Sequence, residues 1–176
     1  MLTHEAIALN HLNRRKEALE KFQAAIALEP KRIQSYLDLA TFYAGTKEEL
    51  PKAFEAIDSA MALEPDNPAA LKAKFKLELR SKNFREALKT VEKYLSLCPQ
   101  DLPMQVEAIR AELTIGEKAK ALSRTEALLA ERPKWIDGWF ELGNCYFELG
   151  RTEEALQAFQ KVVALDKTDQ EAMRRV

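Results

Sequence analysis

The sequence predicts an all-α fold, a right-handed solenoid in which antiparallel helix pairs are stacked one after another. An alanine followed by a large apolar residue recurs at steps of 34 or 35 residues, and a proline follows twelve residues after each of the first four alanines. Two markers in the same phase indicate a helical repeat. Alanine, leucine, glutamate and lysine, all good helix formers, dominate the composition. The alanines are Ala18, Ala53, Ala87, Ala121 and Ala155, and the prolines are Pro30, Pro65, Pro99 and Pro133.

The apolar pattern between the markers places two helices in each repeat. In the last copy Trp139, Leu142 and Tyr146 share one helical stripe, and a second stripe that includes Phe159 follows Gly150. Short turns between the two helices require them to run antiparallel. We expect helices over 2–12, 15–28, 32–44, 50–63, 67–81, 84–97, 102–114, 117–131, 135–148 and 152–165, and a further one that begins near 169.

Capping residues and turns support these boundaries. Asn67 and Pro68 provide an N-cap and a first-turn proline, and Asn83 with Glu86 is typical of a capping pair. The one 35-residue step is explained by a longer turn over 45–51. The chain is therefore predicted to be a single array over 1–176. Its repeats are expected at about 1–32, 33–67, 68–101, 102–135 and 136–169, and 170–176 is the start of a sixth helix pair or a cap.

On these residues the chain resembles the tetratricopeptide repeat family, and the resemblance covers essentially the whole sequence. The fifth copy has the motif most fully, in Trp139, Leu142, Gly143, Tyr146, Ala155, Phe159 and Asp166. In the family, small residues lie where the two helices of one repeat cross closely, as Gly143 against Ala155, and aromatic residues fill the space between repeats. The resemblance implies a superhelix whose inner wall is formed by the first helix of each repeat.

The third and fourth copies depart from this pattern. Phe75 and Ile109 stand where a small residue is usual, and Glu78 and Glu112 stand where tyrosine is usual. We therefore expect the first helix of these two copies to be somewhat rotated or shifted.

Composition excludes several classes of function. The formal net charge is −1 and the isoelectric point about 6.2, so we expect no nucleic-acid partner. No stretch approaches the roughly 18 apolar residues that span a bilayer, so we expect no membrane insertion. The two cysteines are far apart, and no signal-like segment opens the chain, which favours the cytoplasm. The periplasm is the alternative if this sequence belongs to a longer chain with an upstream signal.

No constellation of residues predicts chemistry. His4 and His11 lie two turns apart on one helix, and Cys145 and Cys98 are isolated from one another and from any metal-binding pattern. The few glycines form no phosphate-binding loop. We expect no enzymatic activity, and no catalytic, cofactor or metal site.

The inner wall implied by the resemblance supplies candidate partner-binding residues. Lys72, Lys76 and Arg80 are spaced by four, so they share one helix face and repel each other. They indicate either a solvated face or a surface that binds acidic groups. Phe140 is either a groove anchor or a core residue. The full candidate set is Gln34, Leu37, Asp38, Thr41, Lys72, Lys76, Arg80, Arg110, Phe140, Asn144 and Phe147.

The family's clamp for the C-terminal carboxylate of heat-shock chaperones is predicted to be absent. Glu107, Asp137 and Glu141 fall where that clamp needs amide or basic groups. We expect a scaffold that holds a protein or peptide segment of mixed charge with apolar anchors. The alternative is a structural spacer or self-assembling module that oligomerises through its repeat surfaces or ends. A homo-oligomer or a longer parent array would also cover the apolar end of the fifth copy.

Overall fold

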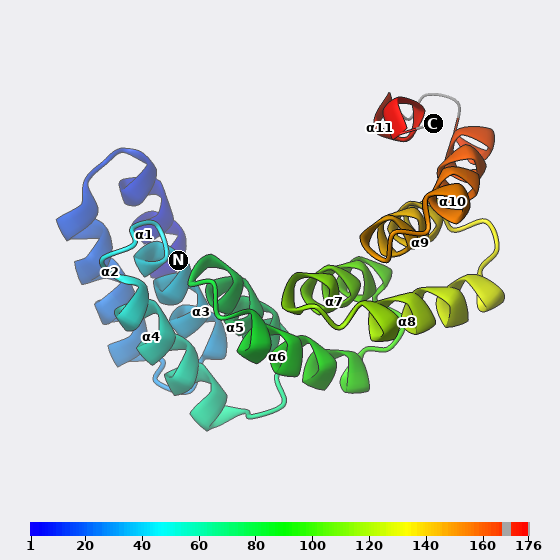
Figure 1. The fold of residues 1–176 in the computed structure, drawn as a ribbon. Coiled ribbons are helices and arrows are strands. Elements are labelled where there is room, and N and C mark those ends of the chain that lie inside the picture. Colours follow the sequence, from blue (N-terminus) through cyan, green and yellow to red (C-terminus); the bar gives the residue numbers. More distant parts are fainter. Residues whose placement is uncertain (167–169, 176) are drawn as a thin grey trace. The chain divides into compact units, whose positions relative to one another are not determined.

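The computed structural model describes residues 1–166 and 170–175, and every regular element within them is a helix (Figure 1). This confirms the predicted all-α repeat fold. The helices are α1 Leu2–His11, α2 Arg15–Leu28, α3 Ile33–Tyr43, α4 Leu50–Leu63, α5 Pro68–Arg80, α6 Phe84–Leu97, α7 Leu102–Ile115, α8 Lys118–Glu131, α9 Ile136–Glu148, α10 Thr152–Leu165 and α11 Gln170–Arg175.

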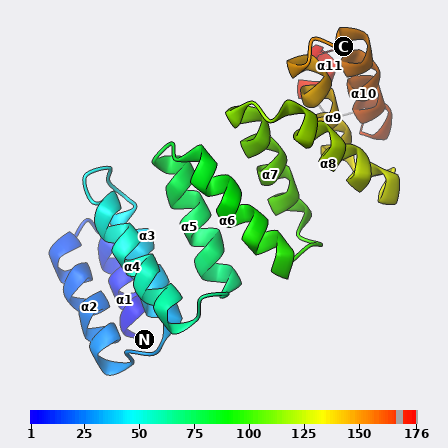
Figure 2. The same ribbon diagram turned by 60° about the horizontal axis from the view of Figure 1, so that its bottom comes forward.

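The chain forms two compact units, Met1–Cys98 with α1–α6 and Pro99–Val176 with α7–α11. Within the first unit, α1 packs on α2, α3 on α4 and α5 on α6, and the first helices of neighbouring pairs are also in contact (Figure 2). Within the second unit, α7 packs on α8 and α9 on α10 in the same way. The junction between the units, after Cys98, falls near the end of the third predicted repeat. The single array and its repeat boundaries stay predictions.

The structure confirms one of the two predicted helix N-caps, Asn67, and contradicts the other, Asn83. Asn67 caps α5, because its side-chain Oδ1 accepts a hydrogen bond of 3.0 Å from the backbone N of Ala70. Asn83 precedes α6 without any side-chain capping bond, so the predicted capping pair is wrong. Glu86, the residue predicted to pair with Asn83, accepts a hydrogen bond of 2.8 Å from the side chain of Lys89 instead. Asp101 is a cap that the sequence analysis did not use, and its Oδ1 accepts a 3.2 Å bond from the N of Met104.

The marker alanines of the first unit lie at the helix crossings. Ala18, Ala53 and Ala87 have no exposed surface, so a larger side chain at any of them would separate the two helices of a pair. Aromatic residues fill the spaces beside these crossings. The ring centroids of Phe22 and Phe42, from the first and second repeats, are 5.3 Å apart.

In the second unit, Gly143 performs the role of a crossing alanine. A Cβ atom on Gly143 would lie only 2.5 Å from Cε1 of Phe159, so the ring of Phe159 occupies the space that other residues use for a side chain. One turn earlier on the same face of α9, Trp139 is half-buried, and its Nε1 donates to the backbone O of Pro133 in the loop before α9 at 2.8 Å. These contacts fix α9 between α8 and α10.

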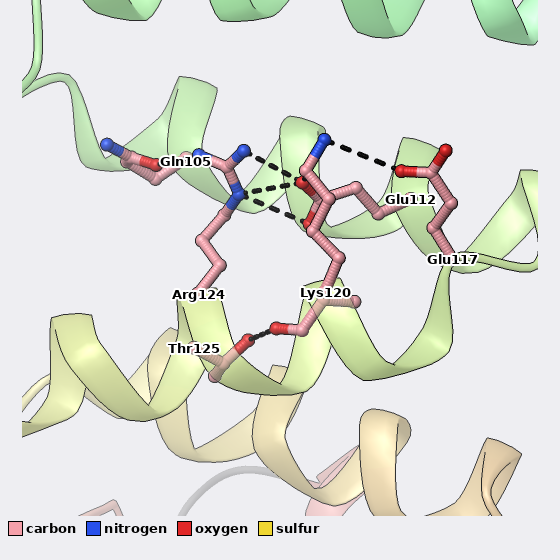
Figure 3. A network of polar contacts seen from close by, with 7 residues as sticks. Gln105, Glu112, Glu117, Lys120, Arg124 and Thr125 are labelled. Carbon is pink, nitrogen blue, oxygen red and sulfur yellow. Dashed lines mark hydrogen bonds and ion pairs between the residues drawn. The ribbon is translucent and has the colours of Figure 1, made fainter.

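Two buried carboxylates occupy positions where tyrosine is usual in the family. Glu112 on α7 is fully buried and accepts hydrogen bonds from Arg124 Nε at 3.0 Å and Nη2 at 2.8 Å (Figure 3). Lys120 Nζ lies 3.6 Å from the same carboxylate, and Arg124 also donates to Gln105. The negative charge of Glu112 is therefore neutralised inside the α7–α8 pair.

Glu78, one repeat earlier, lies in a different environment. It is 4% exposed, its carboxyl bonds to Thr90, and its Oε2 has no hydrogen-bond partner. Thr90 occupies the position equivalent to Arg124, so this position supplies a hydroxyl to Glu78 where α8 supplies a guanidinium to Glu112. Burial consequently raises the pKa of Glu78. The rotation predicted for the first helices of these two copies remains a prediction.

Candidate functional site

The first unit has a cavity of about 590 Å³ between α3 and α5. Its floor is made of small and aliphatic side chains, and its rim carries Thr41 from α3 and three cations from α5. Four of the predicted partner-binding residues therefore line one cavity. The lining residues are Ala40, Thr41, Ala44, Ile57, Ala69, Lys72, Ala73, Lys76, Leu77 and Arg80.

The three cations along α5 differ in their contacts. Lys72 Nζ lies 5.3 Å from the centroid of the Tyr94 ring, which draws this side chain toward α6. Arg80 Nη2 donates a long bond of 3.4 Å to the backbone O of Gly45. Within the described residues, neither Lys76 nor Arg80 has a carboxylate partner, and both are exposed. The rim is thus positively charged and open to solvent.

A smaller cavity of about 190 Å³ lies between α1 and α3 and shares Thr41 with the first. Asp38 lines it and accepts a hydrogen bond of 2.7 Å from Gln34, so these two predicted residues engage each other on the exposed face of α3. Leu37 is different. It is 7% exposed and packs in the core with Ala40, Ala53 and Ile57, so it does not line the groove.

The second unit has a cavity of about 450 Å³ that contains three more predicted residues, Arg110, Asn144 and Phe147. Behind them, Glu141 is 1% exposed and accepts bonds from Arg110 Nε at 2.8 Å and from Asn144 Nδ2 at 3.0 Å. The charge of Arg110 is therefore balanced by a buried carboxylate. Phe147 is 61% exposed and presents its ring to solvent.

Phe140 does not line this cavity and instead packs against Phe159 and Arg175. It is half-buried, and its ring meets the edge of Phe159 at a centroid distance of 5.6 Å. The guanidinium of Arg175 on α11 covers it at 5.1 Å and donates a 2.6 Å bond to Asn144 Oδ1. These contacts agree with the prediction of Phe140 as a core residue, the alternative to a groove anchor. Arg175 is a site residue that the sequence analysis missed, although it lies in the predicted sixth first helix.

Residues suited to chemistry do not gather in the described part of the chain. No group of three or more His, Cys, Asp or Glu side chains there could hold a metal ion, and no helix there is long and apolar enough to cross a membrane. Cys145 has no exposed surface, and burial raises its pKa to about 11. Cys98 is half-buried at the end of α6.

We expect one of the two thiols to react with a chromogenic disulfide reagent in the native protein at pH 8, and both to react in denaturant. At that pH a thiol with a pKa of about 11 is ionised to roughly one part in a thousand, compared with about a quarter for an ordinary thiol. Burial of Cys145 slows the reaction further. The Cys98→Ser variant should therefore release almost no chromophore until it unfolds, and rapid native release would contradict the burial of Cys145.

Comparisons with known proteins agree with this architecture. Residues 136–169, the range predicted for the fifth copy, match the family model of the tetratricopeptide repeat. No curated protein sequence matches the chain. A crystal structure of MamA is similar at 15% identity, over 94% of this chain and 96% of that chain, with a TM-score of 0.76. The structure of YrrB, described as a TPR protein with an unusual peptide-binding site, is similar at 18% identity, over 98% and 89%, with a TM-score of 0.75.

A third similar structure is that of Naa15/Naa10 bound to HypK-THB. It has 17% identity and a TM-score of 0.66, and the match covers 99% of this chain but 30% of that chain. Identities this low show a common fold, an all-α solenoid of helix pairs.

Proposed function

This chain is a tetratricopeptide repeat protein, and we propose that it is a non-catalytic scaffold that holds a segment of a partner protein against the first helices of its repeats. The fold serves generally as a protein-interaction scaffold. A similar structure, that of YrrB, is described as having a peptide-binding site. For this chain we propose the α3–α5 cavity of the first unit as the main site, and the α7–α9 face with Arg110 and Phe147 as a second one.

The observation that carries this proposal is the composition of the α3–α5 cavity. It combines an apolar floor with polar groups on the rim, which is the pattern of sites that bind ligands. Its volume of about 590 Å³ lies in the middle of the roughly 300–1,000 Å³ that binding pockets occupy. A solvated face alone explains the cations, but it does not explain a hollow with an apolar floor beside them.

Affinity capture with rim variants tests the proposal. The Lys76→Glu/Arg80→Glu variant reverses two exposed charges at the cavity, and Lys16→Glu/Lys47→Glu makes the same charge change at exposed positions outside it. We expect the rim variant to capture at least one partner protein in an amount about tenfold or more below that of the unmodified protein. The reason is that a few residues supply most of the binding energy in such interfaces. The control should retain this partner, as measured by quantitative mass spectrometry.

Equal capture by all three proteins would overturn the proposed site. A self-assembling module predicts a different pattern, in which the mass measured by light scattering rises with concentration and no partner is retained. The two functions are therefore separated by measuring solution mass on the same preparations.

A further inference from the structure

The α3–α5 cavity also indicates which chemistry its occupant has. Resting on the proposed function, we propose that the occupant is an acidic peptide segment that places one apolar side chain on the alanine-rich floor while its carboxylates pair with Lys76 and Arg80. The occupant is an internal stretch of a protein, recognised by its side chains. This goes beyond a partner of mixed charge, because it assigns one sign of charge to one site.

Charge complementarity is the first argument. Lys72, Lys76 and Arg80 follow one another at four-residue steps, so their Cα atoms advance by about 6 Å per step along one face of α5. Like charges at this spacing destabilise an isolated helix, and an anionic partner would relieve their repulsion. The cavity lining contains these three cations and no carboxylate.

The neighbouring first helix does not supply the missing negative charge. Asp38 on α3 is held by Gln34 at 2.7 Å and lines the other cavity, toward α1. Arg80 reaches only a backbone carbonyl, that of Gly45. A carboxylate from outside would therefore find exposed donors at Lys76 and Arg80, and Arg80 offers the two parallel hydrogen bonds that suit a carboxylate.

The floor explains why an apolar side chain accompanies the acidic ones. Ala40, Ala44 and Ala73 end at Cβ, so the space above them is unfilled, and Leu77 and Ile57 close it from below. An aliphatic side chain placed there removes apolar surface from water on both partners. A ligand recognised by charge alone would leave this surface exposed.

The cavity of the second unit provides an internal contrast. It too has a cation on a first helix, but Arg110 is paired with the buried carboxylate of Glu141, and Glu107 lies 3.8 Å away. Burial lowers the pKa of Arg110, but the hydrogen bond and the negative charge of Glu141 raise it by more. The pKa of Arg110 is therefore raised overall. Exposed cations without a carboxylate partner among the described residues, Lys76 and Arg80, are therefore a property of the first unit's cavity, and we assign acidic specificity to that cavity alone.

Fluorescence anisotropy with four labelled synthetic peptides tests the inference on the full chain. The reference peptide contains glutamate, serine and a single central leucine. The other three change one property each: leucine to serine, all glutamates to glutamine, or all glutamates to lysine. We expect the reference to bind best, with at least about tenfold weaker binding after loss of the leucine, since one apolar group in a pocket gives about 10–200-fold discrimination.

Protein variants then place the binding. Lys76→Gln/Arg80→Gln should weaken the reference peptide by about tenfold or more, whereas Lys16→Gln/Lys47→Gln should change it by less than about twofold. Ala73→Leu fills the floor and should abolish the preference for leucine over serine. Circular dichroism verifies the fold of each variant, and the two charge variants decide the question even if Ala73→Leu does not fold. Raising the ionic strength from about 0.1 M to about 1 M should weaken binding, because screening then acts within about 3 Å.

Each contrary outcome has a distinct meaning. Binding of the glutamine or lysine peptide as tight as the reference, sensitive to Ala73→Leu, would overturn the acidic occupant and leave the proposed groove function standing. Absence of binding by every peptide would overturn the inference, while the capture experiment separately decides whether the cavity holds any partner. Tighter binding of mixed-sequence single-stranded RNA, lost in Lys76→Gln/Arg80→Gln, would replace a peptide occupant by a nucleic acid.

Discussion

Replacing Arg124 by alanine is expected to destabilise the second unit by about 3 kcal/mol, because it leaves the carboxylate of Glu112 buried without its main counter-charge. Glu112 has no exposed surface in the wild-type protein, so its carboxylate is satisfied by the side chains around it. Lys120 stays at 3.6 Å, and its ammonium supplies one weak contact where Arg124 supplied a planar pair of donors. The cost of the variant is therefore set by desolvation of a charge.

Tryptophan fluorescence during urea unfolding measures this effect in the right part of the chain. Trp135 and Trp139, the two tryptophans of the sequence, both lie in the second unit, whereas circular dichroism reports the helices of both units. The control is Lys118→Ala, which removes an exposed pair with Glu148 and should cost less than about 1 kcal/mol.

The double variant Glu112→Leu/Arg124→Leu separates a buried unpaired charge from lost packing. Removing both partners should recover most of the stability that Arg124→Ala loses, because apolar residues of similar size often replace a buried ion pair without cost. If Arg124→Ala were no more damaging than Lys118→Ala, the guanidinium would not be needed to keep Glu112 buried, and the network of Figure 3 would have no energetic role.

The fold was predictable because its signal is repeated. A helix pair that recurs with Ala18, Ala53, Ala87, Ala121 and Ala155 at its crossing leaves five copies of the same pattern, and errors in one copy are corrected by the others. The capping pair at Asn83 was wrong because capping depends on one side-chain rotamer, for which a sequence pattern shows only the residue types. The buried partners of Glu78 and Glu112 were not predictable, since they follow from which residue of the second helix faces each carboxylate.

The candidate site was predictable to the level of the helix face. Lys76 and Arg80 were assigned to one helix face by four-residue spacing, and Thr41 by the inner wall that the family resemblance implies. All three line one cavity. Leu37 was assigned by the same phase but is buried, because a helix face has margins and an apolar residue at a margin packs inward. Arg175 was missed because its contact with Phe140 depends on how α11 packs, which involves residues distant in sequence.

Replacing Gly143 by valine should destabilise the second unit by about 3 kcal/mol, and replacing it by alanine by about 1 kcal/mol. The alanine Cβ would lie 2.5 Å from Cε1 and 2.7 Å from Cζ of Phe159, closer than van der Waals contact allows, so α9 and α10 must separate or the ring must move. Ordinarily a glycine-to-alanine change within a helix stabilises it by about 1 kcal/mol. A loss of stability on this change therefore has the opposite sign to that of helix propensity and reports the crossing directly.

A double-mutant cycle with Phe159→Leu identifies the clash. In that background the ring that meets the new Cβ is absent, so Gly143→Val should cost less by about 1 kcal/mol or more than it does with Phe159 present. The ring also contacts Phe140 and lies 5.4 Å from the guanidinium of Arg175, so its displacement by Gly143→Val should loosen α11 as well. Hydrogen exchange of the α11 amides reads out this second effect. Equal costs in the two backgrounds would mean that Phe159 does not set the close approach of α9 and α10, and that the small residue at this repeat position serves some other contact.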